Sequence, residues 1–176
     1  MGRGNRTIVV RVWVFLGIAF AVLTTVGCGG AKVTTTTNAQ GQRVLTCAGH
    51  VRFAKTKFLL HSGLAFGAFH RYILKPYRAG SFKKGAPGRT KALAKAGAAG
   101  LFAYHELKVA RNNAICDGSA LRSLATSLSD ALSSLRSLAG LKSGAGLGAI
   151  ATAAAAIGGL GSQAASKGVP IKDLSH

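Results

Sequence analysis

Apolar residues recur at helical spacing along most of the chain after residue 48. The first such stretch runs from about Gly49 to Lys75, and between Phe58 and Leu74 apolar residues cover nearly every side. A helix that is apolar all round belongs at the centre of a bundle or in a membrane. We expect this helix to be a central core helix that ends at Lys75, because Pro76 disfavours helical backbone in the residue before it.

Two further helices are predicted by the spacing of apolar residues. Thr90 is placed to cap a helix that runs to about Asn113, and its expected inward positions are Leu93, Gly97, Gly100, Tyr104, Leu107 and Ala114. The next helix, from about Ser119 to Leu141, carries a seam of leucines at positions 121, 124, 128, 132, 135 and 138. We interpret this seam as a core face; a stripe for a coiled-coil partner is the alternative.

The last predicted helix spans residues 143–166. This stretch contains no charged residue and is long enough to cross a bilayer. Alanine and glycine dominate this segment and it contains few large aliphatic residues, so we expect a tightly packed bundle helix. A second membrane span here, with 58–74 inserted as well, is the alternative. Gly168 and Pro170 end the helix and residues 171–176 form a tail. The predicted fold class is therefore all-α, a compact bundle of about four helices over residues 47–170.

The N-terminal residues have the layout of a secretory signal. Arg3, Arg6 and Arg11 precede an uncharged, mostly apolar run from Val12 to Gly27. Sixteen residues are few for a membrane span, which needs about 20, and suit the apolar region of a signal. We therefore predict that residues 1–27 are a signal peptide and that the protein is exported.

The end of this run, Thr25-Val26-Gly27-Cys28, resembles the lipobox of bacterial lipoproteins. The resemblance implies that Cys28 is acylated, becomes the new N-terminus and anchors the protein to the outer face of the bacterial cytoplasmic membrane. Thr25 departs from the family pattern, which prefers an aliphatic residue there. Cleavage after Ala31 would instead give a secreted protein, and retention of residues 1–27 would leave a single-span anchor.

Residues 28–46 are rich in Thr, Gly, Gln and Asn and have little apolar surface to bury. We expect them to form a flexible spacer between the lipid anchor and the bundle. A short extended stretch at Thr34–Thr37 is the alternative, because Thr and Val favour extended backbone.

Three cysteines are present, and an exported protein with an odd number leaves one thiol to explain. Lipidation or removal of Cys28 accounts for it, so Cys47 and Cys116 are predicted to form a disulfide in an oxidising compartment. Two separate buried thiols are the alternative. No CxxC pair or cluster of Cys and His indicates a metal site, and we predict no metal and no cofactor.

The chain has 23 Lys and Arg against 4 Asp and Glu, a formal charge of +19. Removing the leader with its three arginines leaves 20 against 4, or +16, and this excess favours negatively charged partners. The loop and helix start at residues 76–91 combine basic and aromatic side chains and form the predicted anionic-surface site, which comprises Tyr77, Arg78, Phe82, Lys83, Lys84, Arg89 and Lys91. A solvated loop between helices is the alternative.

No catalytic constellation is apparent, since the four acids are scattered and the five histidines show no ligand or triad spacing. We interpret the histidines as structural or surface residues and expect no enzyme. The expected function is a structural or interaction role at the cell envelope, with the membrane and an anionic lipid or cell-wall polymer as partners and no nucleic acid. The alternatives are an integral or membrane-active protein and a general polyanion-binding protein.

Overall fold

A computed structural model describes the chain in five stretches, which are residues 32–41, 43–49, 51–117, 120–143 and 146–173. The chain separates into the unit Met1–Gly30 and the unit Ala31–His176. The predicted signal peptide and the predicted lipidation site at Cys28 both lie outside the described residues. All of the described helices and strands belong to the second unit.

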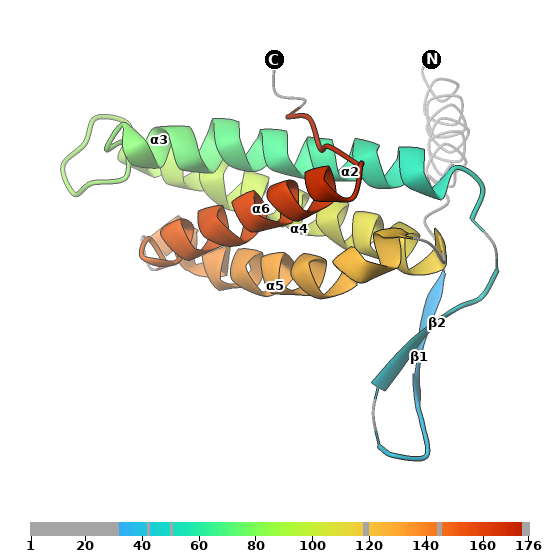
Figure 1. The fold of residues 1–176 in the computed structure, drawn as a ribbon. Helices are drawn as coiled ribbons and strands as arrows, with labels where there is room; N and C mark the ends of the chain where they lie inside the picture. Colours follow the sequence, from blue (N-terminus) through green and yellow to red (C-terminus); the bar gives the residue numbers. More distant parts are fainter. Residues whose placement is uncertain (1–31, 42, 50, 118–119, 144–145, 174–176) are drawn as a thin grey trace, which may run out of the picture. The chain divides into compact units, whose positions relative to one another are not determined.

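The second unit is mostly helical, which confirms the predicted helical bundle in its main outline (Figure 1). Helix α2 (Ala54–Phe69) continues through a π-helical turn, η2 (His70–Leu74), into the short helix α3 (Lys75–Arg78). The remaining elements are α4 (Arg89–Asp117), the 3-10 turn η3 (Ala120–Leu124), α5 (Ala125–Arg136), the 3-10 turn η4 (Ser137–Ser143) and α6 (Ala149–Ser166). Helix α4 is the longest of the described helices.

Helix α4 lies at the centre of the packing, with α2 on one side and α5 on another, while α6 packs on α5. Its inward face is as predicted, except that Tyr104 is only half-buried. The leucine seam is buried at all six positions, and α6 contributes Ile150, Ile157 and Leu160 to the same core. Each fully buried leucine contributes roughly 1.5–3 kcal/mol through removal of its side chain from water. None of the helices in the described part of the chain is long and apolar enough to cross a membrane.

The helix that we expected to end at Lys75 continues for three more residues. The backbone N–H of Lys75 bonds to the carbonyl oxygen of His70, five residues back, so the chain is locally wound as a wider π turn. Pro76 then falls in the first turn of α3, where a helix does not need the N–H that proline lacks. The wider turn therefore lets proline follow a long helix without ending it at once.

Residues 33–47 form a β-hairpin, where the sequence favours a flexible spacer. Strands β1 (Val33–Thr37) and β2 (Arg43–Cys47) pair antiparallel, with Val33 opposite Cys47 and Thr37 opposite Arg43. The hydroxyls of Thr34 and Thr46 lie 3.1 Å apart across the strands. The structure thus agrees with the alternative prediction of an extended stretch at Thr34–Thr37 and not with a flexible spacer. It adds a two-stranded sheet to the predicted all-α class.

The disulfide between Cys47 and Cys116 is present, as predicted, with the two Cα atoms 5.5 Å apart. It connects the last residue of β2 to the last turn of α4, and so attaches the hairpin to the bundle. The disulfide therefore stabilises the threonine-rich hairpin, because an isolated two-stranded hairpin is marginally stable at best in water.

Candidate anionic-surface site

The loop at residues 79–88, between α3 and α4, is held by its own backbone hydrogen bonds. The N–H of Lys83 donates to the carbonyl oxygen of Gly80 at 3.0 Å, and the N–H of Ala86 donates to that of Lys83 at 3.1 Å. Gly85 has a φ of 85°, in the left-handed region that glycine adopts at no steric cost. Successive tight turns therefore give the predicted basic site a defined shape.

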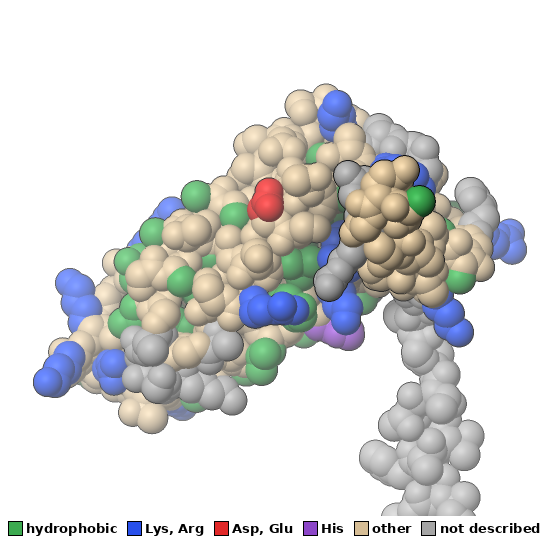
Figure 2. Space-filling view, turned by 90° about the horizontal axis from the view of Figure 1, so that it is seen from below, with side chains coloured by type: hydrophobic (Ala, Val, Ile, Leu, Met, Phe, Trp, Pro, Cys, Tyr) green, Lys and Arg blue, Asp and Glu red, His purple; other side chains and the backbone are tan. Residues whose placement is uncertain are grey.

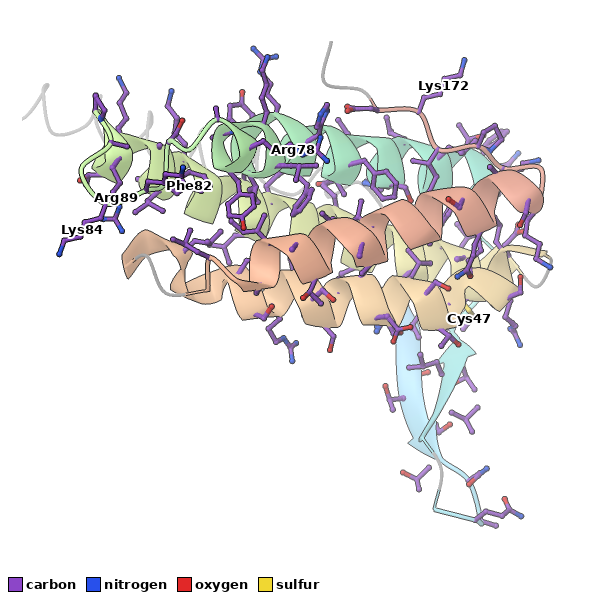
Figure 3. All side chains as sticks on the ribbon, turned by 60° about the vertical axis from the view of Figure 1, so that its left-hand side comes forward. Cys47, Arg78, Phe82, Lys84, Arg89 and Lys172 are labelled. Carbon is purple, nitrogen blue, oxygen red and sulfur yellow. A yellow bond between two sulfur atoms is a disulfide. The ribbon has the colours of Figure 1, made fainter. Side chains whose placement is uncertain are left out.

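Phe82 lies inside the protein, which corrects its assignment to the anionic-surface site. Its side chain is only 2% exposed and belongs to the core of the bundle. The Nε–H of Arg89 donates to the carbonyl oxygen of Phe82 at 3.0 Å, and this bond ties the loop to the start of α4. Figure 3 shows both side chains at this end of the bundle. Phe82 therefore anchors the loop and is not available to contact a surface. Arg89, which holds the loop through this hydrogen bond, is half-buried.

The other predicted members of the site are exposed. The side chains of Arg78, Lys83, Lys84 and Lys91 all face solvent, and Lys84 points away from the bundle (Figure 3). Tyr77 is 37% exposed, so part of its ring is available beside these cations. The structure therefore brings together four of the five predicted cations and one of the two predicted aromatic residues as an exposed group.

A hollow of about 300 Å³ adds residues that were not predicted from the sequence. Lys95 and Tyr72 are the informative members, because Lys95 lies one helical turn after Lys91 and so shares its face. The i, i+4 spacing of the two lysines was visible in the sequence, whereas the proximity of Tyr72 depends on how α2 and α4 pack. The hollow is lined by Tyr72, Pro76, Ser81, Gly88, Lys91, Ala92 and Lys95.

Local electrostatics reinforce the positive charge at this end of the protein. Helix α4 begins here, and its first turn contains no acidic residue to offset the partial positive charge of a helix N-terminus. The sequence has no Asp or Glu before Glu106. Figure 2 shows Lys and Arg side chains projecting from the left end of the bundle, where this loop lies in Figure 1. Side chains and backbone therefore both contribute positive charge at this end of the protein.

Two of the four carboxylates are paired with histidines away from this loop. The Nδ1 of His61 lies 2.6 Å from Oε2 of Glu106 and links α2 to α4, and the Nδ1 of His70 lies 2.9 Å from Oδ2 of Asp173. The paired residues are 45 and 103 positions apart, so no spacing in the sequence indicates them. The pairs also leave the cations of the loop without these two carboxylates as counter-charges.

Within the ranges that the structure describes, no group of three or more His, Cys, Asp or Glu side chains could hold a metal ion. Comparisons with known protein families, with characterised proteins and with solved structures find no match to this chain. Function is therefore inferred from the geometry and charge of the protein itself.

Proposed function

We propose that this protein is a non-enzymatic component of the bacterial cell envelope, anchored through acylated Cys28 and binding anionic surfaces through its basic loop. The observation that carries the proposal is the end of the bundle at residues 75–95, where exposed cations lie before and along the first turns of α4 and where the sequence has no Asp or Glu. We refer to this group, Arg78, Lys83, Lys84, Lys91 and Lys95, as the basic end.

Export is supported by the disulfide between Cys47 and Cys116. Structural disulfides form and persist in oxidising compartments and are rare in the reducing cytoplasm. The bridge leaves Cys28 as the third cysteine, at the position that resembles a lipidation site. The cysteine pairing and the N-terminal signal thus support the same compartment by separate arguments.

The hairpin and the basic end are attached to opposite ends of α4. Cys47 is joined to the last turn of α4, whereas the basic end lies at the first turn. These ends are separated by 29 residues of helix, or about 43 Å at 1.5 Å per residue. A bundle lying along the membrane brings the basic end to anionic lipid headgroups, and an upright bundle presents it to anionic polymers of the cell wall.

Binding of the unit Ala31–His176 to vesicles tests the proposal. This compact unit contains the described core and both bridged cysteines, and it lacks the apolar N-terminal segment that would bind vesicles by itself. We expect it to bind vesicles of phosphatidylglycerol mixed with phosphatidylcholine more tightly than vesicles of phosphatidylcholine alone, and to lose this preference as salt is added. A soluble poly(glycerol phosphate) in the same assay represents the cell-wall polymer.

The decisive variant replaces Lys83 and Lys84 by alanine. A lysine near an anionic surface contributes about 1 kcal/mol, so the double variant should lose about 2 kcal/mol, or roughly 30-fold in affinity. The matched control replaces Arg52 and Lys55 by alanine, which removes the same charge from exposed positions around the start of α2. Equal losses in the two variants would show that net charge alone matters, and absence of binding to both anionic partners would contradict the proposal.

A further inference from the structure

Two hollows lie along the groove between α4 and α5. One hollow of about 320 Å³ is lined by Gly97, Gly100, Leu101, Tyr104, Leu135, Arg136 and Leu138. A second hollow of about 330 Å³ is lined by Tyr104, Lys108, Arg111, Ser129, Leu132, Ser133 and Arg136. Tyr104 and Arg136 line both, so the two hollows meet at this pair. Each is within the size range of small-molecule sites.

The two hollows follow one another along a single face of α4. Their α4 residues are 97, 100, 101, 104, 108 and 111, which recur at spacings of three and four. From Gly100 to Arg111 the helix rises about 16 Å. The two hollows therefore form one continuous groove along α4, and their lining side chains differ from one end to the other.

The beginning of the groove is apolar. Gly97 and Gly100 of α4 carry no side chain, and the other apolar lining residues include Leu135 of α5 and Leu138 of η4. Leu101 lines the same hollow and is 61% exposed, an unfavourable position for a large aliphatic side chain in water. This half of the groove matches an alkyl chain.

The end of the groove is cationic. Lys108, Arg111 and Arg136 line the second hollow, and none of the three forms an ion pair with a carboxylate in the described stretches. The Nε of Arg111 is buried and has no hydrogen-bond partner among the described residues. A buried donor without a partner is destabilising, and the side chain that carries it lines this hollow. The hydroxyls of Ser129 and Ser133 line the same hollow.

Arg136 is oriented at the junction of the two halves. Its Nη2 donates to the hydroxyl of Tyr104 at 2.7 Å, and its guanidinium carbon lies 5.5 Å from the centre of the tyrosine ring. A guanidinium held in this way retains further N–H groups for the oxygens of a carboxylate or phosphate, which it can bind in a bidentate manner. The boundary between apolar and cationic surface is thus built by a fixed pair of side chains.

We propose that this groove binds a single-chain anionic amphiphile. The alkyl chain lies along Gly97, Gly100 and Leu101, and the carboxylate or phosphate head lies among Arg136, Lys108 and Arg111. Charge complementarity identifies the head group, because every ionisable side chain other than Tyr104 that lines the second hollow is a cation. The apolar first hollow distinguishes an amphiphile from a small free anion. This binding does not depend on the basic end, which lies outside the groove.

Calorimetric titration of the unit Ala31–His176 tests the inference with four probes below their aggregation concentrations. Dodecyl phosphate and dodecanoate are expected to bind. Dodecanol, which has the chain without the charge, and inorganic phosphate, which has the charge without the chain, are each expected to bind at least tenfold more weakly. Equal binding of dodecanol and dodecyl phosphate, or binding of neither anionic amphiphile, would overturn the proposal.

Two variants probe the two halves of the groove separately. Arg136→Ala is expected to weaken dodecyl phosphate binding about tenfold or more, because hydrogen bonds to charged groups are among the stronger ones. Leu101→Asp changes an exposed position and places a carboxylate beside the alkyl chain, so it should weaken binding without unfolding the protein. Lys55→Ala is the matched control for loss of one exposed cation and should bind as the unaltered unit does.

Failure of this inference can be separated from failure of the proposed function. The variant lacking Lys83 and Lys84 should bind dodecyl phosphate as the unaltered unit does but bind anionic vesicles more weakly. Arg136→Ala should bind dodecyl phosphate more weakly but bind the vesicles as the unaltered unit does. If Arg136→Ala and Lys55→Ala bind dodecyl phosphate equally well, the groove is not the site.

Discussion

Removal of the disulfide between Cys47 and Cys116 should destabilise the whole bundle and not only the hairpin. Between these two cysteines the chain contains all of α2 and α3 and nearly all of α4. The folded bundle brings the ends of this segment together whether or not the bridge is present. In the unfolded chain, by contrast, the bridge removes a large number of conformations that the reduced chain can adopt.

The magnitude depends on the length of the closed loop. The cysteines are 69 residues apart. The chain-entropy relation for a loop of this length gives about 4.4 kcal/mol at 25 °C. A domain of this size loses about 3 °C in melting temperature for each kcal/mol, so the bridge should raise Tm by roughly 10–15 °C. This is a large part of the 5–15 kcal/mol typical of domain stability.

Urea denaturation followed by far-ultraviolet circular dichroism measures the effect in the unit Ala31–His176. The variant with both cysteines replaced by serine is compared with the oxidised protein, and reduced unaltered protein serves as a control for the substitutions themselves. We expect a loss of about 3–5 kcal/mol. A loss below about 1 kcal/mol would show that the bridge only attaches the hairpin and would refute the loop-closure argument.

Two other expectations concern single side chains. Glu106→Ala should cost about 1–3 kcal/mol in urea denaturation, because it leaves a half-buried histidine without its partner, whereas the exposed neighbour His105→Ala should change stability by less than about 0.5 kcal/mol. Equal effects would show that the pair contributes nothing. Gly158→Ala should stabilise α6 by about 0.5–1 kcal/mol, since its added Cβ meets nothing within 4 Å. Gly161→Ala should gain less in the same urea denaturation measurement, because its Cβ would lie 3.3 Å from the ring of Phe66. Equal gains would show that the Phe66 ring moves aside at no measurable cost.

The features that can be predicted well from the sequence are local ones. The leucine seam of α5 and its flanking turns and the inward face of α4 appear as periodic spacing within single helices, and those residues are buried as expected apart from half-buried Tyr104. The disulfide is inferred from the count of cysteines and the compartment. Neither inference requires knowledge of which helix packs against which.

The features that cannot be predicted from the sequence depend on contacts between distant segments. The threonine-rich strands have no fully buried residue among their described side chains and carry little apolar alternation, and their pairing depends on each other and on the bridge to Cys116. Phe82 is an apolar residue in a polar loop, where no periodicity indicates whether it faces inward. The cationic half of the groove needs the register between α4 and α5, which brings Arg111 and Arg136 to one hollow.

Export and lipid anchoring are tested most directly by the intact mass of the protein recovered from the membranes of the cells that make it. We predict a chain that starts at Cys28 and carries the added mass of a lipid, with Cys47 and Cys116 reacting with an alkylating agent only after reduction. A chain that retains residues 1–27, or whose two inner cysteines are alkylated without reduction, would contradict an exported, lipid-anchored protein.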